Sequence, residues 1–310
     1  MSDLILHHYP TSPFAEKIRL ILGAKKLNWQ SVHIPMVMPK PDLVALTGGY
    51  RRTPVLQIGA DVYCDTSLIC DVIENLVPEP ALYPSSHKGL ARVLAQWADT
   101  TLFQAAMAYN FQPKGALSIF PDPDQLKIFA QDRAAMRNNA PRMPAADATA
   151  AYKSYLRRIA NMLDAQAYLM GDAPCIADFA VYHPLWFTRT RMPVMADILN
   201  ATPQVLSWMD RMAAIGHGNS TKCSPEEAIA VASATQPALI SNEIFQDEHE
   251  IALGSEVVIA AESFGLEPTA GILLAATRTR YTIARIDARA GKVHVHFPRV
   301  GFVLKKADAV

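Results

Sequence analysis

The stretch YPTSPFAEKIR, residues 9–19, decides the fold of this chain. It follows a short apolar run, residues 4–9, which predicts a buried strand that ends at a proline-rich loop. Beyond the loop, apolar residues recur at helical spacing among charged ones as far as residue 22, so we expect an amphipathic helix. Ser12 directly before Pro13 is typical of a helix N-cap with proline in the first turn.

The residues that follow complete a unit of mixed strands and helices. Residues 31–37 predict a second strand, and residues 55–58 and 62–64 predict an antiparallel hairpin. Residues 67–76 predict a helix. The order β-α-β followed by β-β-α within about 80 residues is that of a thioredoxin-like domain. We assign residues 1–83 to this domain.

A helical part follows, because after Pro84 the composition shifts towards Ala, Leu, Met, Gln and Arg, which favour helix. One further helix is expected from Cys175 to about Phe187, and another begins at Pro203. The other helical stretches are residues 87–111, 123–139 and 146–169. We therefore predict that residues 86–216 form an all-helical domain.

The last part of the chain, residues 225–310, has a third pattern. Residues 216–220 read as a flexible break, and Ser224-Pro225-Glu226-Glu227 is a capping box that starts a short helix. Strand-like segments punctuated by glycine then predict a small β-barrel or β-sandwich of four to six strands. These segments are residues 257–259, 272–274, 281–283 and 293–297.

Composition and charge exclude several classes of function. Lys and Arg together number 29, as do Asp and Glu, so the basic footprint of a nucleic-acid-binding protein is missing. We expect no membrane partner, because no apolar run reaches the roughly 20 residues that span a bilayer. The N-terminus has no secretory pattern, which together with unpaired cysteines indicates a cytoplasmic protein. Those cysteines are Cys64, Cys70, Cys175 and Cys223. No metal site is predicted, because the histidines show no ligand spacing.

Residues 9–19 resemble the active-site loop and first helix of glutathione transferases, closest to the omega class and the Ser-type zeta and theta classes. Thr53-Pro54 stands where this family has its cis-proline, and Asp65-Thr66-Ser67 where it has an acidic residue, a hydroxyl and then a helix. Residues 173–178 resemble the capping box of the family's sixth helix. The resemblance covers residues 1 to about 216 and implies the same two domains that the patterns predict.

The resemblance implies that Ser12 is the catalytic residue. A free thiol has a pKa of about 8.5, so little of glutathione is ionised at neutral pH. A hydrogen bond from the Ser12 hydroxyl and the positive end of the helix would both favour the thiolate. Tyr9 is the alternative, because Tyr-type transferases place a hydroxyl at the end of this strand, and plain helix capping is a second alternative for Ser12. Ser12 and Ala15 replace the cysteines of a C-P-x-C motif, so disulfide exchange is not expected.

The resemblance also implies a set of glutathione-binding residues. The Thr53 backbone would pair with the cysteinyl backbone, and Asp65 with the γ-glutamyl amine. Thr66 at a helix N-terminus would bind the γ-glutamyl carboxylate, although helix capping explains these two residues equally well. Lys40 is either a ligand of the glycyl carboxylate or a solvated surface lysine. The full set is Phe14, Lys40, Thr53, Pro54, Asp65 and Thr66, with Arg51 and Arg52 as further cationic candidates.

The function that the resemblance implies is glutathione transfer to a small hydrophobic electrophile. No cofactor is expected beyond glutathione as co-substrate, and the family implies a homodimer. The electrophile would lie between the two domains, where Met107, Tyr109 and Phe111 are candidate wall residues or else ordinary core.

Two other interpretations remain. The chain is a non-catalytic binding or scaffold protein, since fold alone does not imply catalysis. Alternatively, the C-terminal β-domain binds a protein or nucleic acid through a locally basic region. That region contains Arg278, Arg280, Arg285 and Arg289.

Overall fold

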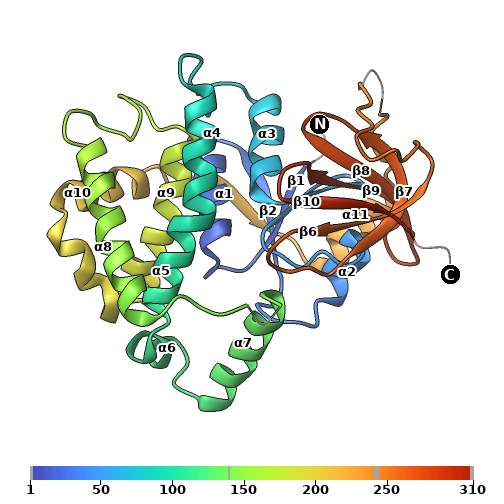
Figure 1. Cartoon of the computed structure of the whole chain (residues 1–310). Coiled ribbons are helices and arrows are strands. Elements are labelled where there is room, and N and C mark those ends of the chain that lie inside the picture. Colours follow the sequence, from blue (N-terminus) through green and yellow to red (C-terminus); the bar gives the residue numbers. More distant parts are fainter. Residues whose placement is uncertain (1–2, 139, 241–243, 308–310) are drawn as a thin grey trace.

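The fold is built on one sheet that runs through both the first and the last parts of the chain. The computed structural model describes residues 3–138, 140–240 and 244–307. The described strands form a ten-stranded sheet in the order β10-β6-β7-β8-β9-β4-β3-β1-β2-β5. Figure 1 shows this sheet on one side and a group of helices on the other.

The first part of the chain has the thioredoxin-like order that the sequence predicts. Strand β1 pairs parallel with β2 and antiparallel with β3, and β3 pairs antiparallel with β4. The second strand was predicted a few residues too late, and the proline-rich loop contains an unpredicted short helix, α2. The elements are β1 (Leu4–His8), α1 (Pro13–Ala24), β2 (Asn28–His33), α2 (Pro41–Thr47), β3 (Val55–Ile58), β4 (Asp61–Cys64) and α3 (Thr66–Leu76).

The amphipathic character predicted for α1 is wrong. Glu16, Lys17 and Arg19 are all 5% exposed or less, as are the apolar residues between them. The helix packs against both α3 and α9, so it has no face left for solvent. Its charges are paired inside the protein instead, Arg19 with Glu16 at 2.6 Å and Lys17 with Asp99 at 2.6 Å.

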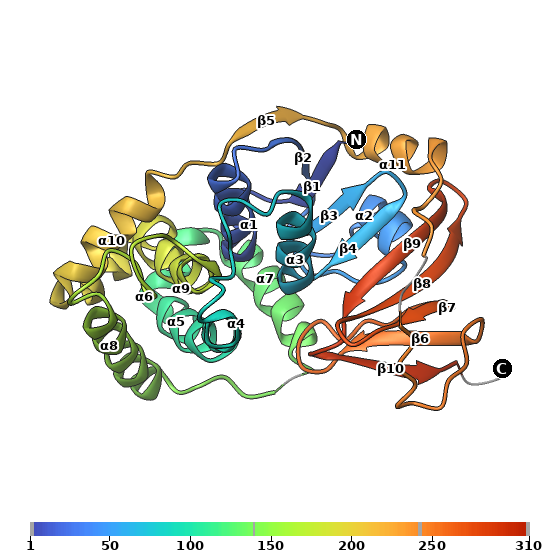
Figure 2. The ribbon, with the colours of Figure 1, turned by 90° about the horizontal axis from the view of Figure 1, so that it is seen from above.

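The helical part is confirmed and contains two π-helical turns, η1 and η2, that the sequence does not reveal. Figure 2 shows its helices gathered on the α1 and α3 side of the sheet. The elements are α4 (Lys88–Trp97), η1 (Ala98–Leu102), α5 (Phe103–Asn110), α6 (Pro113–Ile119), α7 (Pro123–Met136), α8 (Ala145–Met162), α9 (Ile176–Trp186), η2 (Phe187–Arg191), the 3₁₀ helix η3 (Pro193–Ala201) and α10 (Pro203–Ala213). None of the helices in the described ranges has the length and apolarity needed to cross a bilayer.

The C-terminal strands are confirmed, but they do not close into a separate barrel or sandwich. Strands β6 to β10 pair antiparallel among themselves, and β9 continues into the thioredoxin-like sheet by pairing parallel with β4. This pairing covers the edge of β4, whose backbone groups would otherwise be left without strand partners. The elements are β5 (Asn219–Lys222), α11 (Pro225–Ala234), β6 (Glu256–Ala261), β7 (Thr269–Ala276), β8 (Arg280–Asp287), β9 (Gly291–Pro298) and β10 (Phe302–Lys306).

The β4–β9 junction carries a buried polar group on one face. His296 Nε2 lies 2.9 Å from Asp61 Oδ1, and the His296 ring stacks on Tyr63 with centroids 4.5 Å apart. The predicted flexible break after residue 216 is partly ordered as well, because β5 adds to the far edge of the sheet beside β2. Strand patterns do not state their partners, so neither pairing could be found in the sequence.

Two large apolar cores result from this arrangement, beside a small apolar cluster of Phe187, Met192 and Met195. One lies between the sheet, α1, α3 and the helical part, and the other lies between the sheet, α2 and α11. Figure 2 shows α2 within the curve of the sheet, where it packs against β4 and β9. The predicted functional residues lie where the N-termini of α1 and α3 meet the loops before α2 and β3.

Candidate functional site

Ser12 is the N-cap of α1 and is almost fully buried. Its Oγ accepts a hydrogen bond from the Ala15 N–H at 3.2 Å, and its own N–H donates to the Tyr9 carbonyl at 3.1 Å. Among the described residues, none accepts the hydroxyl hydrogen. A cap uses only a lone pair of the oxygen, so capping and donation to a ligand are compatible. At 2% exposure, Ser12 is closed to solvent in this structure.

Tyr9 points to a different part of the site. Its hydroxyl accepts a hydrogen bond from Arg133 of α7 at 3.4 Å, and the Lys40 ammonium lies 5.8 Å from its ring centroid. The Tyr9 side chain therefore belongs to a cationic group beside the α1 terminus, whereas the Ser12 hydroxyl lies at the terminus itself.

The peptide bond between Thr53 and Pro54 is cis, as the sequence predicts. The strand pairing of β3 starts at Val55, so the Thr53 backbone lies just outside the ladder. This is the backbone position that an added peptide strand would use. The Thr53 hydroxyl is occupied, because Oγ1 accepts a hydrogen bond from Lys40 at 3.3 Å.

Asp65 caps α3 and is also paired with an arginine. Its carboxylate accepts the N–H of Ser67 at 2.9 Å, and its second oxygen lies 3.4 Å from Arg52. The backbone of Asp65 has φ of 73°, a left-handed conformation that non-glycine residues adopt only when their surroundings hold it. Asp65 therefore caps the helix, as one of the two alternatives proposed. The Asp65 side chain remains about one-quarter exposed.

Thr66 is connected to a buried charge that the sequence did not reveal. Lys17 of α1 donates to Thr66 Oγ1 at 3.3 Å and to Asp99 at 2.6 Å. Burial acts to lower the Lys17 pKa, but Asp99 and neighbouring acidic groups outweigh it and raise that pKa above its usual value. A permanent positive charge therefore lies directly behind the N-terminus of α3.

Asp99 also holds a histidine that lies against Phe14. His183 Nε2 lies 2.9 Å from Asp99, and burial lowers the His183 pKa, so the ring is neutral and Nε2 carries the hydrogen. The Phe14 ring lies 4.5 Å from the His183 ring and 4.7 Å from Phe103. Asp99 lies on the π-helical turn η1, a local irregularity often found at functional sites that apolar periodicity does not predict.

Lys40 is not a solvated surface lysine. It is 3% exposed and donates to the Arg51 carbonyl at 3.1 Å as well as to Thr53. Burial lowers its pKa to about 7, with further lowering by Arg133 and Arg51. The sequence left two alternatives open; the burial of Lys40 contradicts the solvated surface lysine, and the role as a ligand of the glycyl carboxylate stays a prediction.

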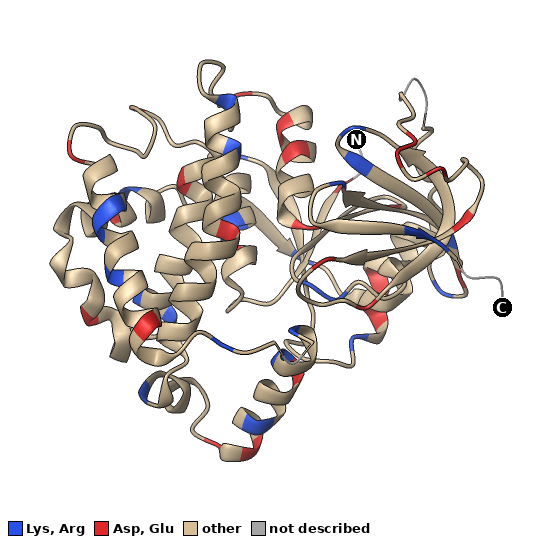
Figure 3. Cartoon of the chain, viewed as in Figure 1, with Lys and Arg blue, Asp and Glu red and all other residues tan. Residues whose placement is uncertain are grey.

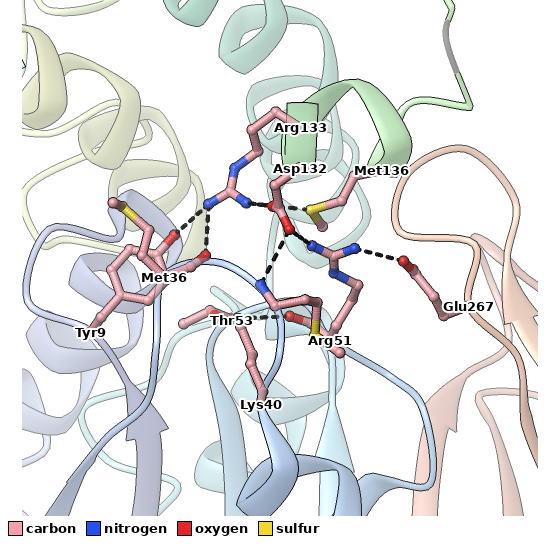
Figure 4. A network of polar contacts seen from close by, with 10 residues as sticks. Tyr9, Met36, Lys40, Arg51, Thr53, Asp132, Arg133, Met136 and Glu267 are labelled. Atoms are coloured by element: carbon pink, nitrogen blue, oxygen red, sulfur yellow. Dashed lines mark hydrogen bonds and ion pairs between the residues drawn. The ribbon is translucent and has the colours of Figure 1, made fainter. Parts of the chain in front are cut away.

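Arg51 joins Lys40 to the rest of the chain through two carboxylates. It forms a very short ion pair with Asp132 of α7 and a second pair with Glu267 at 2.7 Å, as Figure 4 shows. Asp132 also pairs with Arg133 and accepts the Met38 N–H at 3.2 Å. We call Lys40, Arg51, Asp132, Arg133 and Glu267 the Lys40 cluster.

The loop before β7 adds a third wall to the site. Arg52 donates to the carbonyl of Phe264 at 2.6 Å, and the Gly265 N–H donates to the carbonyl of Met136 at 2.7 Å. Gly265 has φ of 62°, which favours glycine, and a side chain there would meet Met136 at 3.1 Å. The thioredoxin-like part, α7 and the C-terminal strands therefore meet at this site.

The other candidate residues lie elsewhere or are already engaged. Tyr109 donates to the Met195 carbonyl at 3.0 Å, and Phe111 packs on Phe129 and Phe187, so both are partly buried against a small apolar cluster. Arg285 and Arg289 of the basic region bind the Ala45 carbonyl and Asp42. Figure 3 shows acidic and basic positions interspersed in both the helical and the β parts. A hollow of about 500 Å³ between the segment after α8 and α10 shares no residue with the candidate site.

Comparisons with known proteins identify relatives for the whole chain. The family models described as "Glutathione S-transferase, N-terminal domain" and "Glutathione S-transferase, C-terminal domain" match residues 6–81 and 133–211, together half of the chain. A crystal structure of a GST-like protein from Pseudomonas syringae is 42% identical, with a TM-score of 0.83. It covers 98% of this chain and is itself covered completely, so the C-terminal strands are common to both proteins.

Two curated proteins match shorter parts of the chain. FtsZ-localized protein A of Caulobacter vibrioides is 25% identical over 180 residues, which are 56% of this chain and 72% of that protein. Pyrimidodiazepine synthase of Drosophila melanogaster is 30% identical over 76 residues, which are 23% of this chain and 31% of that protein. The names of these two relatives describe a localisation and a reaction, so they point to different kinds of function.

Proposed function

This chain belongs to the glutathione transferase superfamily, and from that premise we propose that it conjugates glutathione to an electrophilic, apolar small molecule. The observation that carries the proposal is the Ser12 hydroxyl at the N-terminus of α1, whose hydrogen no described residue accepts. A glutathione sulfur beside this hydroxyl receives its hydrogen bond and faces the positive end of the helix. Both interactions stabilise the thiolate over the thiol and lower the thiol pKa.

The thiolate is the nucleophile of the proposed reaction. It forms a carbon–sulfur bond with the electrophile and breaks the bond to a leaving group such as halide, which departs with the bonding electron pair, while the thiol proton passes to solvent. The reaction needs no cofactor other than glutathione as co-substrate. Ser12 stays in place as a hydrogen-bond donor throughout, so its contribution is electrostatic and no covalent bond forms to the protein.

Residues on three sides of Ser12 support binding of the tripeptide. The Thr53 backbone next to the cis-proline pairs with the cysteinyl backbone. The N-terminus of α3 at Thr66, with Lys17 behind it, suits the γ-glutamyl carboxylate, and Asp65 suits the γ-glutamyl amine. Lys40 is the candidate partner of the glycyl carboxylate, at the opposite end of the tripeptide from the γ-glutamyl group.

The experiment is a calorimetric titration with glutathione, beside a conjugation assay with an aryl halide. We expect saturable binding to the wild type. Ser12→Ala should keep glutathione affinity and lose about 10²-fold in kcat, the order found when one preorganised donor to a developing anion is removed. Thr11→Ala, which removes a neighbouring hydroxyl, should change neither quantity. Absence of binding to the wild type would contradict the proposal.

A second variant separates catalysis from folding. Ser12→Ala also removes a helix cap, which costs about 0.5–2 kcal/mol of stability. Ser12→Thr keeps both the cap and the hydroxyl, so we expect it to keep most of the activity. If Ser12→Thr were as inactive as Ser12→Ala, the hydroxyl would not be the group that matters.

A non-catalytic role is the second candidate, and one observation favours it. FtsZ-localized protein A, which matches this chain over 180 residues, is named for a protein that it localises with. On this alternative the chain binds a protein filament and transfers no glutathione. Co-sedimentation with polymerised FtsZ, together with undetectable conjugation by the wild type, would support this role.

A further inference from the structure

We propose that α7 is a cover over the glycyl end of the glutathione site, held shut by Asp132, whose carboxylate takes the place of the glycyl carboxylate of glutathione. The inference rests on the proposed function, since it concerns access to the same site. Glutathione enters by exchanging its own carboxylate for Asp132 as the partner of Arg51. Three groups of observations lead to this inference.

The first is the direction of the tripeptide. Asp65 and Thr66 lie at the N-terminus of α3, Ser12 caps α1, and Thr53 precedes the cis-proline before β3. A tripeptide held by its γ-glutamyl end at α3 and by its cysteine at Thr53 must extend its glycine beyond Thr53. Lys40 is the cation in that direction, because its ammonium lies 3.3 Å from Thr53 Oγ1.

The second is the charge of the Lys40 cluster. Arg51 pairs with both Asp132 and Glu267, Arg133 pairs with Asp132, and Lys40 lies beside them as a further basic group that donates to the Arg51 carbonyl. The side chains of Arg51 and Asp132 are 6% and 8% exposed, so their ion pair is shielded from water. An anion is therefore favoured here, and Asp132 supplies it from within the chain. The glycyl carboxylate has the same chemistry and competes for the same guanidinium.

The third is how lightly α7 is packed. Within α7, Met136 is the sole buried residue, and the helix otherwise packs through Phe129, whose ring lies 4.7 Å from Phe120 and 5.4 Å from Phe111. Its last turn is held by polar contacts, from Arg133 to the Met36 carbonyl at 3.1 Å and from Gly265 to Met136. Elements with few buried apolar contacts are the ones that open most readily.

The site as a whole is closed, which requires some element to move. Ser12, Lys40 and Thr66 are exposed by only 2%, 3% and 5%. The α7 helix is the element that can move, because the ligand replaces its main ionic contact. When Asp132 leaves Arg51, the glycyl carboxylate forms an ion pair with Arg51 in its place. The loop before β7 holds the other nitrogen of Arg51 through Glu267, so the guanidinium stays in position while its partner changes.

The test uses two ligands and a matched pair of variants of the full chain. Glutathione and its glycyl ethyl monoester, which lacks the glycyl carboxylate, are titrated calorimetrically into wild type, Asp132→Asn and Asp124→Asn. Asp124 lies exposed in the first turn of the same helix, so its change removes the same charge without touching the cluster. We expect Asp132→Asn to bind glutathione at least about fivefold more tightly than wild type, the lower end of usual coupling between sites. The monoester, which cannot pair with Arg51, should bind wild type and Asp132→Asn more weakly than glutathione does, and Asp124→Asn should match wild type within about twofold.

Hydrogen exchange gives an independent readout of the cover. We expect amide exchange in residues 126–136 to be faster in Asp132→Asn than in Asp124→Asn, and faster in wild type when glutathione is bound. Glutathione affinity that is equal or weaker in Asp132→Asn would overturn this inference and leave the proposed function standing. Failure of every variant to bind glutathione would overturn both. If Asp132→Asn does not fold, Met136→Ala loosens α7 at its one buried residue and must also tighten glutathione binding, or the inference falls.

Discussion

Lys40 is a buried lysine among other cations, and its protonation is linked to ligand binding. Burial, Arg133 and Arg51 lower its pKa to about 7, so above that pH the amine of the free protein is neutral. A carboxylate bound beside it favours the charged form and raises the pKa again. Binding therefore takes up a proton above pH 7, and affinity falls as the pH rises through the interval between the two pKa values.

This linkage can be measured without interference from the thiol. S-methylglutathione has both carboxylates but no ionisable sulfur. We expect its binding at pH 8 to take up close to one proton, measured by calorimetry in two buffers of different ionisation enthalpy. Lys40→Met should abolish the uptake, and Lys153→Met, on the exposed face of α8, should not. Uptake that survives in Lys40→Met would assign the proton to another group.

For single residues, the sequence correctly predicts the positions that depend on a local motif. Ser12 before Pro13, Thr53 before Pro54 and Asp65 before Thr66 lie at element ends, as expected. Their proposed roles in binding and catalysis stay predictions. Asp132 and Glu267 were missed, because acidic residues in a helix and a loop look solvated until tertiary packing brings them to Arg51.

The helix α1 shows how an element can carry charges and still be buried on every side. The sequence predicts its extent correctly but not its surroundings, because Lys17 and Glu16 suggest a solvated face. The structure instead gives Lys17 an acidic partner 82 positions along the chain. A pattern of charges within one helix does not record partners on another.

We expect Lys17→Met to destabilise the protein by about 3–5 kcal/mol, because it leaves Asp99 with the neutral His183 but without its buried cation. It should also weaken glutathione binding, since Thr66 loses the positive charge behind it. Chemical denaturation measures the first effect and calorimetry the second. Lys127→Met removes an exposed lysine of α7 and is the control. Equal stability of the two variants would show that the Lys17 pair contributes nothing.

The whole molecule presents an apolar surface that suits the homodimer expected for the family. Leu90 and Val93, three positions apart on one face of α4, are 59% and 64% exposed, and Leu76 at the end of α3 is 39% exposed. Exposed apolar side chains that share one face of a helix can form a patch of the kind that marks contacts between proteins. We expect a dimer in solution, with these residues in its interface.

Leu90→Glu combined with Val93→Glu should convert that dimer to a monomer, because two charges per subunit would be buried without partners. Size-exclusion chromatography with light scattering measures the mass. Ile286→Glu is the control, since Ile286 is 83% exposed on β8 and lies outside the proposed interface. A wild type that is monomeric at micromolar concentration, or a dimer that survives the double substitution, would contradict this prediction.

Because β4 pairs with β9, the sheet of the N-terminal domain cannot be completed until the C-terminal strands have been synthesised. The ribosome delivers β9 about 230 residues after β4, which at usual translation rates takes roughly 10 to 45 seconds. During that time the edge of β4 has no strand beside it, and the nascent N-terminal domain is open to pairing with other chains. The protein should therefore depend on chaperones, or on slow production, more than a transferase whose sheet is finished within its first domain.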